Sequence, residues 1–399
     1  MHLVEASAAT AAMKARWAEL ARAIAAAPPQ PAAPVAQRQG QLSIMGSGIA
    51  HGHLSIDVER HIAVADRVFY SINDHITKNW LRQLRPDGFD LAILYHEAID
   101  RHATYTRMAE ALLHYVRQGE HVAAVFYGHP GIFAAPGHRA VQLARKEGHR
   151  ARMHPGISAL DCLVADLGFD PGLPGLLSYE ATDLLLRRRR LDPSLHTMLW
   201  QVGVVGELGY RREGYGNQGL PLLVDLLEEA YGADFELVHY VGAQYAGGEP
   251  LIERLSVVAL RDPHQARRLT TLSTFYLAPA AVSETDPARA HAFGAPIRRR
   301  PTGVMRDLTQ YGPRERKSLA SMAPLAFSSG YRVQETSPVI DFLDALQRDI
   351  ALRGRFERDP AAVLDGPEGA QLTERQKSLL GTQHNKAIIA AITEPGERG

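Results

Sequence analysis

Few features of the specialised protein classes occur in this chain of 399 residues. Its single cysteine, Cys162, excludes an internal disulfide and favours a reducing compartment, so we expect a cytoplasmic protein. No segment approaches the roughly 20 apolar residues of a membrane span, and Lys14 and Arg16 interrupt the apolar core that a signal peptide would need. The 44 basic residues balance 44 acidic ones, so we expect neither a nucleic-acid nor a membrane partner.

Motifs of several common enzyme classes are also missing. No G-x-S-x-G elbow is present, which argues against the common serine hydrolases. The glycine-rich segment Gly46 to Gly52 is neither G-x-G-x-x-G nor a Walker motif, which disfavours nicotinamide and nucleoside-triphosphate binding. His96 and His102 are spaced to lie on opposed faces of a helix, whereas a zinc-binding pair lies one turn apart. We therefore expect no metal.

What is present is a globular pattern, with 45% hydrophobic residues and enough length for two or three domains. From residue 41, short apolar runs alternate with amphipathic helices, which is typical of an α/β fold. The predicted strands are 42–45, 67–70, 91–94 and 122–127, followed by longer ones at 197–205, 235–241 and 253–259. The predicted segments are an Ala-rich helix with a Pro-rich linker (1–40), an α/β subdomain (41–195), an α+β subdomain (196–280), a connecting or clasp region (281–336), a helical domain (337–382) and a tail (383–399).

The helical domain is predicted from its helix-start signals. Ser337 with Pro338 and Asp359 with Pro360 each suit a helix beginning, and Thr373 with Gln376 has the form of a capping box. Three short helices make a bundle too small to be stable alone, so we expect it to dock on the larger body.

The tail carries an apolar run close to the end of the chain: Ala387, Ile388, Ile389, Ala390, Ala391 and Ile392. An exposed apolar terminus gains nothing in water, so something is expected to cover it. One candidate is a final helical turn packed on the bundle, since the isoleucines also form a reasonable helix face. The other is an extended segment held in a binding site.

The loops after the predicted strands carry the best clue to chemistry, because ligands of open α/β sheets bind at strand ends. The three glycine-containing loops, 46–52, 127–133 and 154–159, resemble in order those of the tetrapyrrole methylase superfamily of S-adenosylmethionine (SAM) methyltransferases. His129 stands where most members carry an acid, which favours the branch of borosin-type, omphalotin-like peptide backbone α-N-methyltransferases. Four strings resemble that branch: 127–133, 178–183, 199–201 and 273–276.

The resemblance implies a two-domain methyltransferase fold followed by a small helical domain, and it assigns catalysis to Tyr95, Arg101 and Tyr105. A peptide N–H is a very weak acid whose nitrogen lone pair is delocalised, so the proton must be removed and the developing imidate oxygen stabilised. Arg101 suits the oxygen as a permanent cation. Either Tyr95 or Tyr105 is the base, with its acidity promoted by the guanidinium, and the sequence does not decide between them.

The resemblance also implies contacts with SAM and with its product S-adenosylhomocysteine. These residues are Gly46, Ser47, Gly48, Tyr127, His129, Ile132, Phe133, Ser158, Gln201, Ala243 and Thr274. Structural explanations exist beside this one, since the glycines suit backbone with positive φ and Ser158 suits a helix cap.

The implied substrate is the chain's own tail, 387–392, delivered in trans to the partner subunit of a homodimer. A tethered acceptor has a high effective concentration, so weak contacts suffice. Two alternatives stay open. The chain could methylate a small molecule and use its tail structurally, or it could be a SAM-binding module without catalysis.

Overall fold

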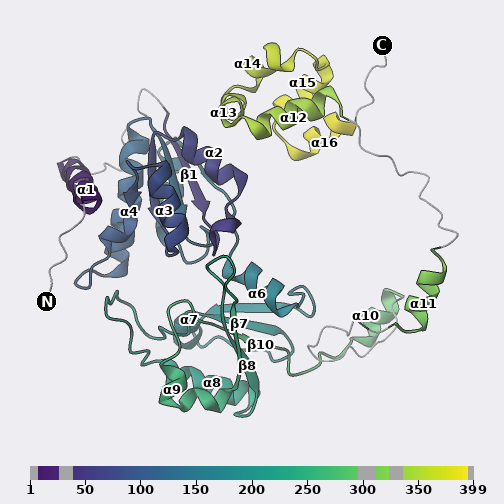
Figure 1. Ribbon diagram of the computed structural model, residues 1–399. Coiled ribbons are helices and arrows are strands. Elements are labelled where there is room, and N and C mark those ends of the chain that lie inside the picture. The colour runs from purple at the N-terminus through teal and green to yellow at the C-terminus, as the bar shows by residue number, and fades with distance from the viewer. Residues whose placement is uncertain (1–7, 27–38, 295–308, 310, 323–335, 394–399) are drawn as a thin grey trace. The chain divides into compact units, whose positions relative to one another are not determined.

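The computed structural model describes residues 8–26, 39–294, 309, 311–322 and 336–393 (Figure 1). Within the chain there are two compact units, residues 1–308 and residues 309–399. The first unit contains both β-sheets, and the second unit is helical.

The first sheet has five parallel strands in the order β3-β2-β4-β1-β5. They are β1 (Gln41–Gly46), β2 (Arg67–Ser71), β3 (Phe89–Asp90), β4 (His121–Phe126) and β5 (Arg150–Met153). Alternate residues of β4 enter opposite cores: Val122 and Ala124 pack on one face, Ala123 and Val125 on the other. Both faces are therefore covered, as parallel sheets require. The covering helices are α2 (Ile56–Val64), α3 (His75–Leu84), α4 (Arg101–Arg117) and α5 (Ala135–Lys146).

The predicted N-terminal helix is confirmed as α1 (Ala8–Ala26), and the structure shows what it contacts. Trp17 and Leu20 are buried in the core beneath α4 and β3, and the Trp17 ring meets Phe89 edge-on at 5.5 Å. Arg16 Nη2 donates to the backbone oxygen of Gly88 at 3.1 Å. Burial of each large side chain contributes roughly 2 kcal/mol, so α1 belongs to the first unit.

The second sheet also has five strands, in the order β6-β7-β10-β8-β9. Only β6 and β7 run parallel, and the other neighbours are antiparallel. Its strands are β6 (Leu176–Glu180), β7 (His196–Trp200), β8 (Glu236–Val241), β9 (Leu251–Ser256) and β10 (Thr274–Leu277). Its helices are α6 (Ala159–Leu167), α7 (Ala181–Leu186), α8 (Leu220–Tyr231) and α9 (Pro263–Ala266).

Several predicted strands need correction. The segment 91–94 is a 3₁₀ helix (Leu91–Leu94), because Asp90 Oδ1 accepts a hydrogen bond from the N–H of Ala92 and caps it. The strand predicted at 197–205 ends at Trp200, where Gln201 turns the chain with a φ of 57°. The strand predicted at 253–259 ends at Ser256 and continues as a 3₁₀ helix.

The second sheet begins earlier in the chain than the expected boundary at residue 196. Strand β6, Leu176–Glu180, pairs with β7 rather than with the first sheet. The pattern of apolar runs gave no sign of this, because β6 is only partly buried and reads as part of a loop.

The second unit is a bundle of short helices, and all three predicted starts are confirmed. The helices are α12 (Pro338–Arg348), α13 (Ile350–Arg358), α14 (Pro360–Leu364), α15 (Glu374–Gly381) and α16 (Asn385–Thr393). Ser337 and Asp359 cap their helices, and Thr373 forms the capping box with Gln376. The helix that begins at Pro338 ends at Arg348, because Asp349 caps a separate helix that begins at Ile350.

The tail forms α16 and completes the core of the bundle. Ala391 is 1% exposed, and Ile388 and Ile392 pack on the buried cluster that includes Leu380. Ile389 points outward and is 52% exposed. Of the two interpretations of the tail, this structure shows the helical one.

The predicted connecting region, 281–336, crosses the boundary between the two units and is only partly described. It contains two short helices, α10 (Pro287–Ala292) and α11 (Pro313–Ala320). Half of the expected clasp lies outside the described residues.

Candidate functional site

The three glycine-containing loops meet at one edge of the first sheet. A Cβ on Gly46 would lie 2.2 Å from the backbone oxygen of Gly128, and one on Gly156 would lie 2.9 Å from the Cα of Gly46. Gly48 and Gly128 exchange backbone hydrogen bonds of 3.3 and 3.0 Å. The glycines are needed because β1 and β4 end side by side and their loops cross in contact.

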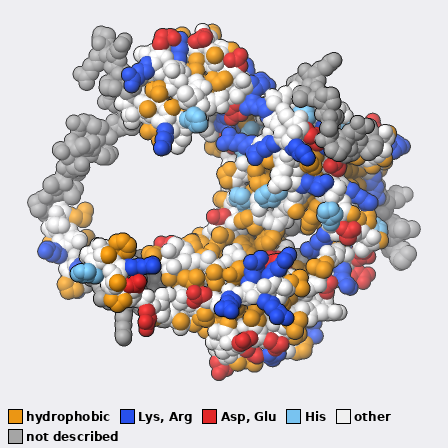
Figure 2. Space-filling model, turned by 180° about the vertical axis from the view of Figure 1, so that it is seen from behind, with side chains coloured by type: hydrophobic (Ala, Val, Ile, Leu, Met, Phe, Trp, Pro, Cys, Tyr) orange, Lys and Arg blue, Asp and Glu red, His pale blue; other side chains and the backbone are white. Residues whose placement is uncertain are grey.

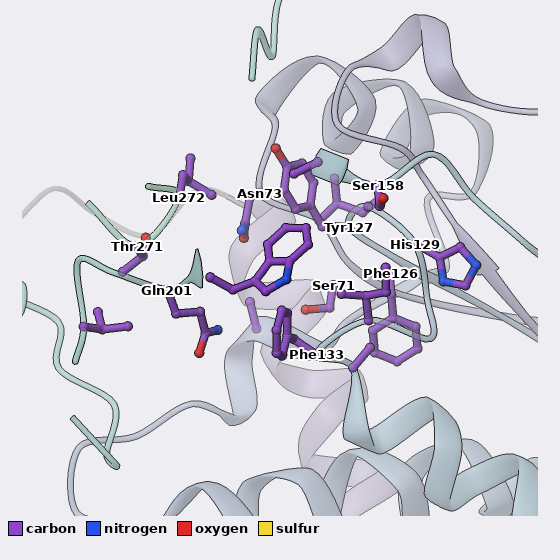
Figure 3. Close-up of a pocket in the computed structure, with 18 of the residues that line it drawn as sticks. Ser71, Asn73, Phe126, Tyr127, His129, Phe133, Ser158, Gln201, Thr271 and Leu272 are labelled. Atoms are coloured by element: carbon purple, nitrogen blue, oxygen red, sulfur yellow. The ribbon is translucent and has the colours of Figure 1, made fainter. Parts of the chain in front are cut away.

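Beside these loops lies a cavity of about 490 Å³ in the first unit, within the usual range for small-molecule sites (Figure 3). Residues from the regions of both β-sheets of that unit line it. Ser71 ends β2 and Asn73 follows it, Tyr127 follows β4, and Gln201 and Thr271 come from the region of the second sheet.

An aromatic group forms one part of the wall. The hydroxyl of Tyr127 accepts a 2.8 Å hydrogen bond from Gln244 Nε2, while burial raises the pKa of Tyr127 to about 12. Phe133 meets Trp200 edge-on at 5.6 Å. Phe133 and Gln201 have φ values of 53° and 57°, in the left-handed region that side chains seldom adopt. Such strained residues tend to cluster at functional sites.

The three predicted catalytic residues all line this cavity. Tyr95 directly follows the 3₁₀ helix, and Arg101 begins α4, which Asp100 caps by accepting a hydrogen bond from the N–H of Ala103. The rings of Tyr95 and Tyr105 lie edge to face with centroids 6.5 Å apart. The structure therefore brings together two phenols and a guanidinium.

The surroundings of Tyr95 make it a weaker acid than the sequence predicted. Burial raises the pKa of Tyr95 well above the ordinary value, and the charge and hydrogen bond of Tyr105 raise it further. Arg101 lowers it, but this effect is smaller than that of burial. Tyr95 is thus a neutral phenol near pH 7.

Of the residues predicted to contact the cofactor, seven line the cavity: Tyr127, His129, Ile132, Phe133, Ser158, Gln201 and Thr274. Gly46, Ser47, Gly48 and Ala243 do not. The Ser47 hydroxyl instead donates to the oxygen of Gly48 at 3.0 Å, inside the loop contact.

Ser158 and His129 have structural partners as well. Ser158 caps α6 by accepting hydrogen bonds from the N–H groups of Leu160 and Asp161, so the cap and the cavity position coexist. His129 Nδ1 accepts from the N–H of Gly131 at 3.0 Å. Figure 3 shows the His129 ring on the far side of the site from Gln201.

Two tyrosines at the site were missed by the reasoning from sequence. Tyr210 and Tyr215 belong to the loop 206–216 and line the cavity, and the Tyr210 ring packs on Tyr95 with centroids 5.2 Å apart and planes 32° apart. A signal was present, because this loop combines four glycines with two tyrosines.

Side chains of both charges lie on the surface (Figure 2). On the face shown in Figure 2, basic, acidic and hydrophobic side chains are interspersed. Within the described residues, no group of three or more His, Cys, Asp or Glu is placed to hold a metal. No helix in that part of the chain is both long and apolar enough to cross a membrane.

Comparison with known proteins first defines the class. The family of tetrapyrrole (corrin/porphyrin) methylases matches residues 41–245, from β1 to just beyond β8, and so covers the strand-end loops and most of the residues that line the cavity. Among solved structures, the uroporphyrin-III C-methyltransferase of Thermus thermophilus aligns over 60% of this chain and 92% of its own, with 18% identity and a TM-score of 0.43.

The relatives of nearly full length then define the branch. A type I borosin cyclic peptide precursor and methyltransferase of Mycena rosella is 37% identical over 90% of this chain and 91% of its own. The dendrothelin A precursor and methyltransferase of Dendrothele bispora is 42% identical over 89% of this chain and 88% of its own. The chain therefore belongs to the borosin family of methyltransferases that are also peptide precursors, within the tetrapyrrole methylase superfamily. The predicted family and fold class are confirmed.

Proposed function

We propose that this protein transfers methyl groups from SAM to backbone amide nitrogens of a peptide, and that the peptide is its own C-terminal tail. The observation that carries this proposal is that Tyr95, Arg101 and Tyr105 line one cavity beside the strand-end loops. A permanent cation and a pair of phenols are the groups that amide deprotonation requires.

The side chains of the cavity fit SAM chemically. Hydroxyl and amide groups of Ser71, Asn73 and Gln201 offer uncharged donors and acceptors for the ribose and the purine edge. The faces of Tyr127 and Phe133 suit a flat purine, and aromatic faces also attract cations such as a sulfonium. When bound, SAM supplies a methyl group activated by positively charged sulfur and leaves as S-adenosylhomocysteine.

The roles of the three catalytic residues follow from their surroundings. Arg101 holds the peptide oxygen as negative charge develops on it, since its charge is permanent. Tyr105, as a phenolate, takes the amide proton, because burial raises the pKa of Tyr95 and keeps Tyr95 neutral. Tyr95 holds Tyr105 in place through the edge-to-face contact of their rings. The amide nitrogen loses its proton and gains the methyl group.

The tail is suited to this role by its side chains rather than by its present conformation. Ala and Ile residues add little bulk to a backbone that must pass a reactive centre. In α16, however, the amides are helical, as in the 2.9 Å hydrogen bond from the N–H of Ile388 to the oxygen of His384. Methylation at these positions therefore requires α16 to unwind.

We further propose that the tail of one subunit reaches the site of its partner in a homodimer. The test mixes unlabelled Arg101→Ala chain with ¹⁵N-labelled wild-type chain and SAM, then resolves the two by intact mass. Methyl groups on the unlabelled chain support transfer in trans. Methylation of the labelled chain alone contradicts transfer in trans, and an unmodified mixture contradicts the proposed function.

A methyltransferase for a small molecule is the second candidate. It is favoured by the helical state of the tail, since Ala391 is part of the bundle core. In that case the mixture stays unmodified while soluble substrates are methylated.

A further inference from the structure

A second hollow of about 630 Å³ lies next to the site cavity in the first unit. Its lining consists of Glu97 and residues of the segment 206–214. Tyr210 lines both spaces, so the hollow leads to the ring that packs on Tyr95. The two spaces thus meet at the proposed reaction centre.

The loop that forms this hollow is held in place at several points. At its start, the N–H of Gly206 donates to Thr182 Oγ1 at 3.0 Å. Just past its end, the side chain of Asn217 hydrogen-bonds two backbone groups at 2.8 and 2.9 Å. At its tip, the N–H of Arg212 donates to Glu97 Oε1 at 2.8 Å. These bonds fix a wall opposite the segment that leads into α4.

The chemistry of the hollow suits an extended peptide. Leu208 is 72% exposed, which gives the rim an apolar contact. Glu207 and Arg211 pair with each other at 3.4 Å, and Glu97 and Glu213 add two further carboxylates to the lining. Gly209 and Gly214 leave stretches of backbone uncovered by side chains, and backbone groups are natural partners for a peptide main chain.

We infer that this hollow is the binding groove for the acceptor peptide, which runs between Glu97 and the loop 206–214 and passes Tyr210 to reach Tyr95. The inference rests on the proposed function and extends it to the path of the substrate. Tyr210 is a positioning residue: its ring packs on Tyr95, whose ring in turn meets Tyr105 edge to face. Leu208 contacts the apolar side chains of the peptide.

The first test locates the peptide by crosslinking. Benzoylphenylalanine is placed in the full chain at position 208 and, as the control, at position 222, where Leu222 is 61% exposed on α8 and lines neither space. The probe is a synthetic peptide with the sequence of residues 383–399. Crosslinks to that sequence at 208 and not at 222 support the groove. Absence of crosslinks at 208, or equal yields at both positions, overturns it.

The second test uses kinetics with the same peptide supplied in trans. Leu208→Asp should raise KM about tenfold at unchanged kcat, since a charge at the rim opposes an apolar ligand. Tyr210→Ala should lower kcat by about ten- to a hundredfold, because misplacement of a catalytic group is costly. Tyr210→Phe should keep kcat, since only the ring is needed. SAM affinity should stay within twofold in all three.

The outcomes separate this inference from the proposed function. If wild type methylates the peptide but Leu208→Asp and Tyr210→Ala do so at the wild-type rate, the groove is wrong and the function stands. If the chain with benzoylphenylalanine at position 208 crosslinks the peptide and the wild type does not methylate it, the groove stands and the proposed function fails.

Discussion

The two units of this protein differ in the packing of their apolar and aromatic side chains, which line a cavity in the first unit and fill a core in the second. In the first unit, Tyr127, Phe133 and Trp200 surround an open cavity, and Phe133 remains 49% exposed. In the second unit, short capped helices fill their core completely enough that Ala391 of the tail is 1% exposed. The first unit therefore has a cavity that can take a ligand, whereas the helices of the second unit pack into a filled core.

The proposed substrate is part of the folded core of the second unit, because it forms helix α16 there. The nine residues of α16 are too few for a stable helix in water, so its helical state depends on the bundle. Backbone methylation removes the N–H donor, as proline does, and a modified segment cannot return to a helix without loss. Each transfer would therefore hinder the return of the tail to the bundle.

The largest effect is expected from removing the cation of the open site. Arg101→Ala should lower methylation at least ~100-fold, because the developing oxygen charge loses its partner. Titration calorimetry with SAM should give an affinity within a few-fold of wild type. The matched control is Arg107→Ala, on the same helix but not in the cavity wall, which should keep its activity. Full activity of Arg101→Ala would show that the cavity does not use this cation.

The second prediction loosens the filled core without altering the tail. Leu380→Ala removes a side chain that is 0% exposed on α15, which should cost about 2–4 kcal/mol of unfolding free energy in this unit. Hydrogen exchange of 385–393 should accelerate, and methylation should become faster if release of the tail limits the rate. Ser378→Ala, an exposed position on the same helix, serves as the control. Unchanged exchange in Leu380→Ala would mean that the bundle does not hold α16.

The third prediction tests the crossing of loops that opens the first site. Gly46→Ala places a methyl group 2.2 Å from the oxygen of Gly128, so the loops must separate at a cost of about 1–3 kcal/mol. SAM binding, followed by calorimetry, should weaken accordingly. Gly52→Ala, whose added Cβ meets nothing within 4 Å, should bind SAM as wild type does. Equal affinities for the two variants would disconnect the loop contact from the site.

The smallest effect concerns pH and the first unit alone. Burial lowers the pKa of His121 to about 4, and His121 Nε2 lies 3.0 Å from Ser43 Oγ. Since the unfolded chain takes up a proton near pH 6.5 and the folded protein does not, stability is present above that pH and declines as pH falls towards 4. Between pH 7.5 and 5.5 the contribution of this group should fall by about 1 kcal/mol. Urea unfolding followed by Trp fluorescence measures it, and His121→Gln should lose that part of the slope; an identical slope in the variant would contradict the assignment.

Local signals in the sequence predicted much of both units. The caps at Ser337, Asp359 and Thr373 depend only on neighbouring residues, so they were readable. The strand-end loops were readable for the same reason. The start of the second sheet at Leu176 was not, because a half-buried strand is defined by its partner β7 rather than by its own pattern.

The site shows the same division. Tyr95, Arg101 and Tyr105 are near one another in the chain, and their meeting follows from one turn and one helix. Tyr210 comes from a loop more than a hundred residues away, and its contact with Tyr95 depends on tertiary structure. The neutral state of Tyr95 was also hidden, since burial is a property of the folded protein.

The most direct test of the account is residue-resolved fragment mass spectrometry of the full chain after incubation with SAM. We expect additions of whole CH₂ units on backbone nitrogens within 387–392 of the wild-type chain, and none in Arg101→Ala. An unmodified tail after long incubation, with SAM bound and α16 still protected, would contradict the claim that the open unit methylates the segment that the closed unit holds.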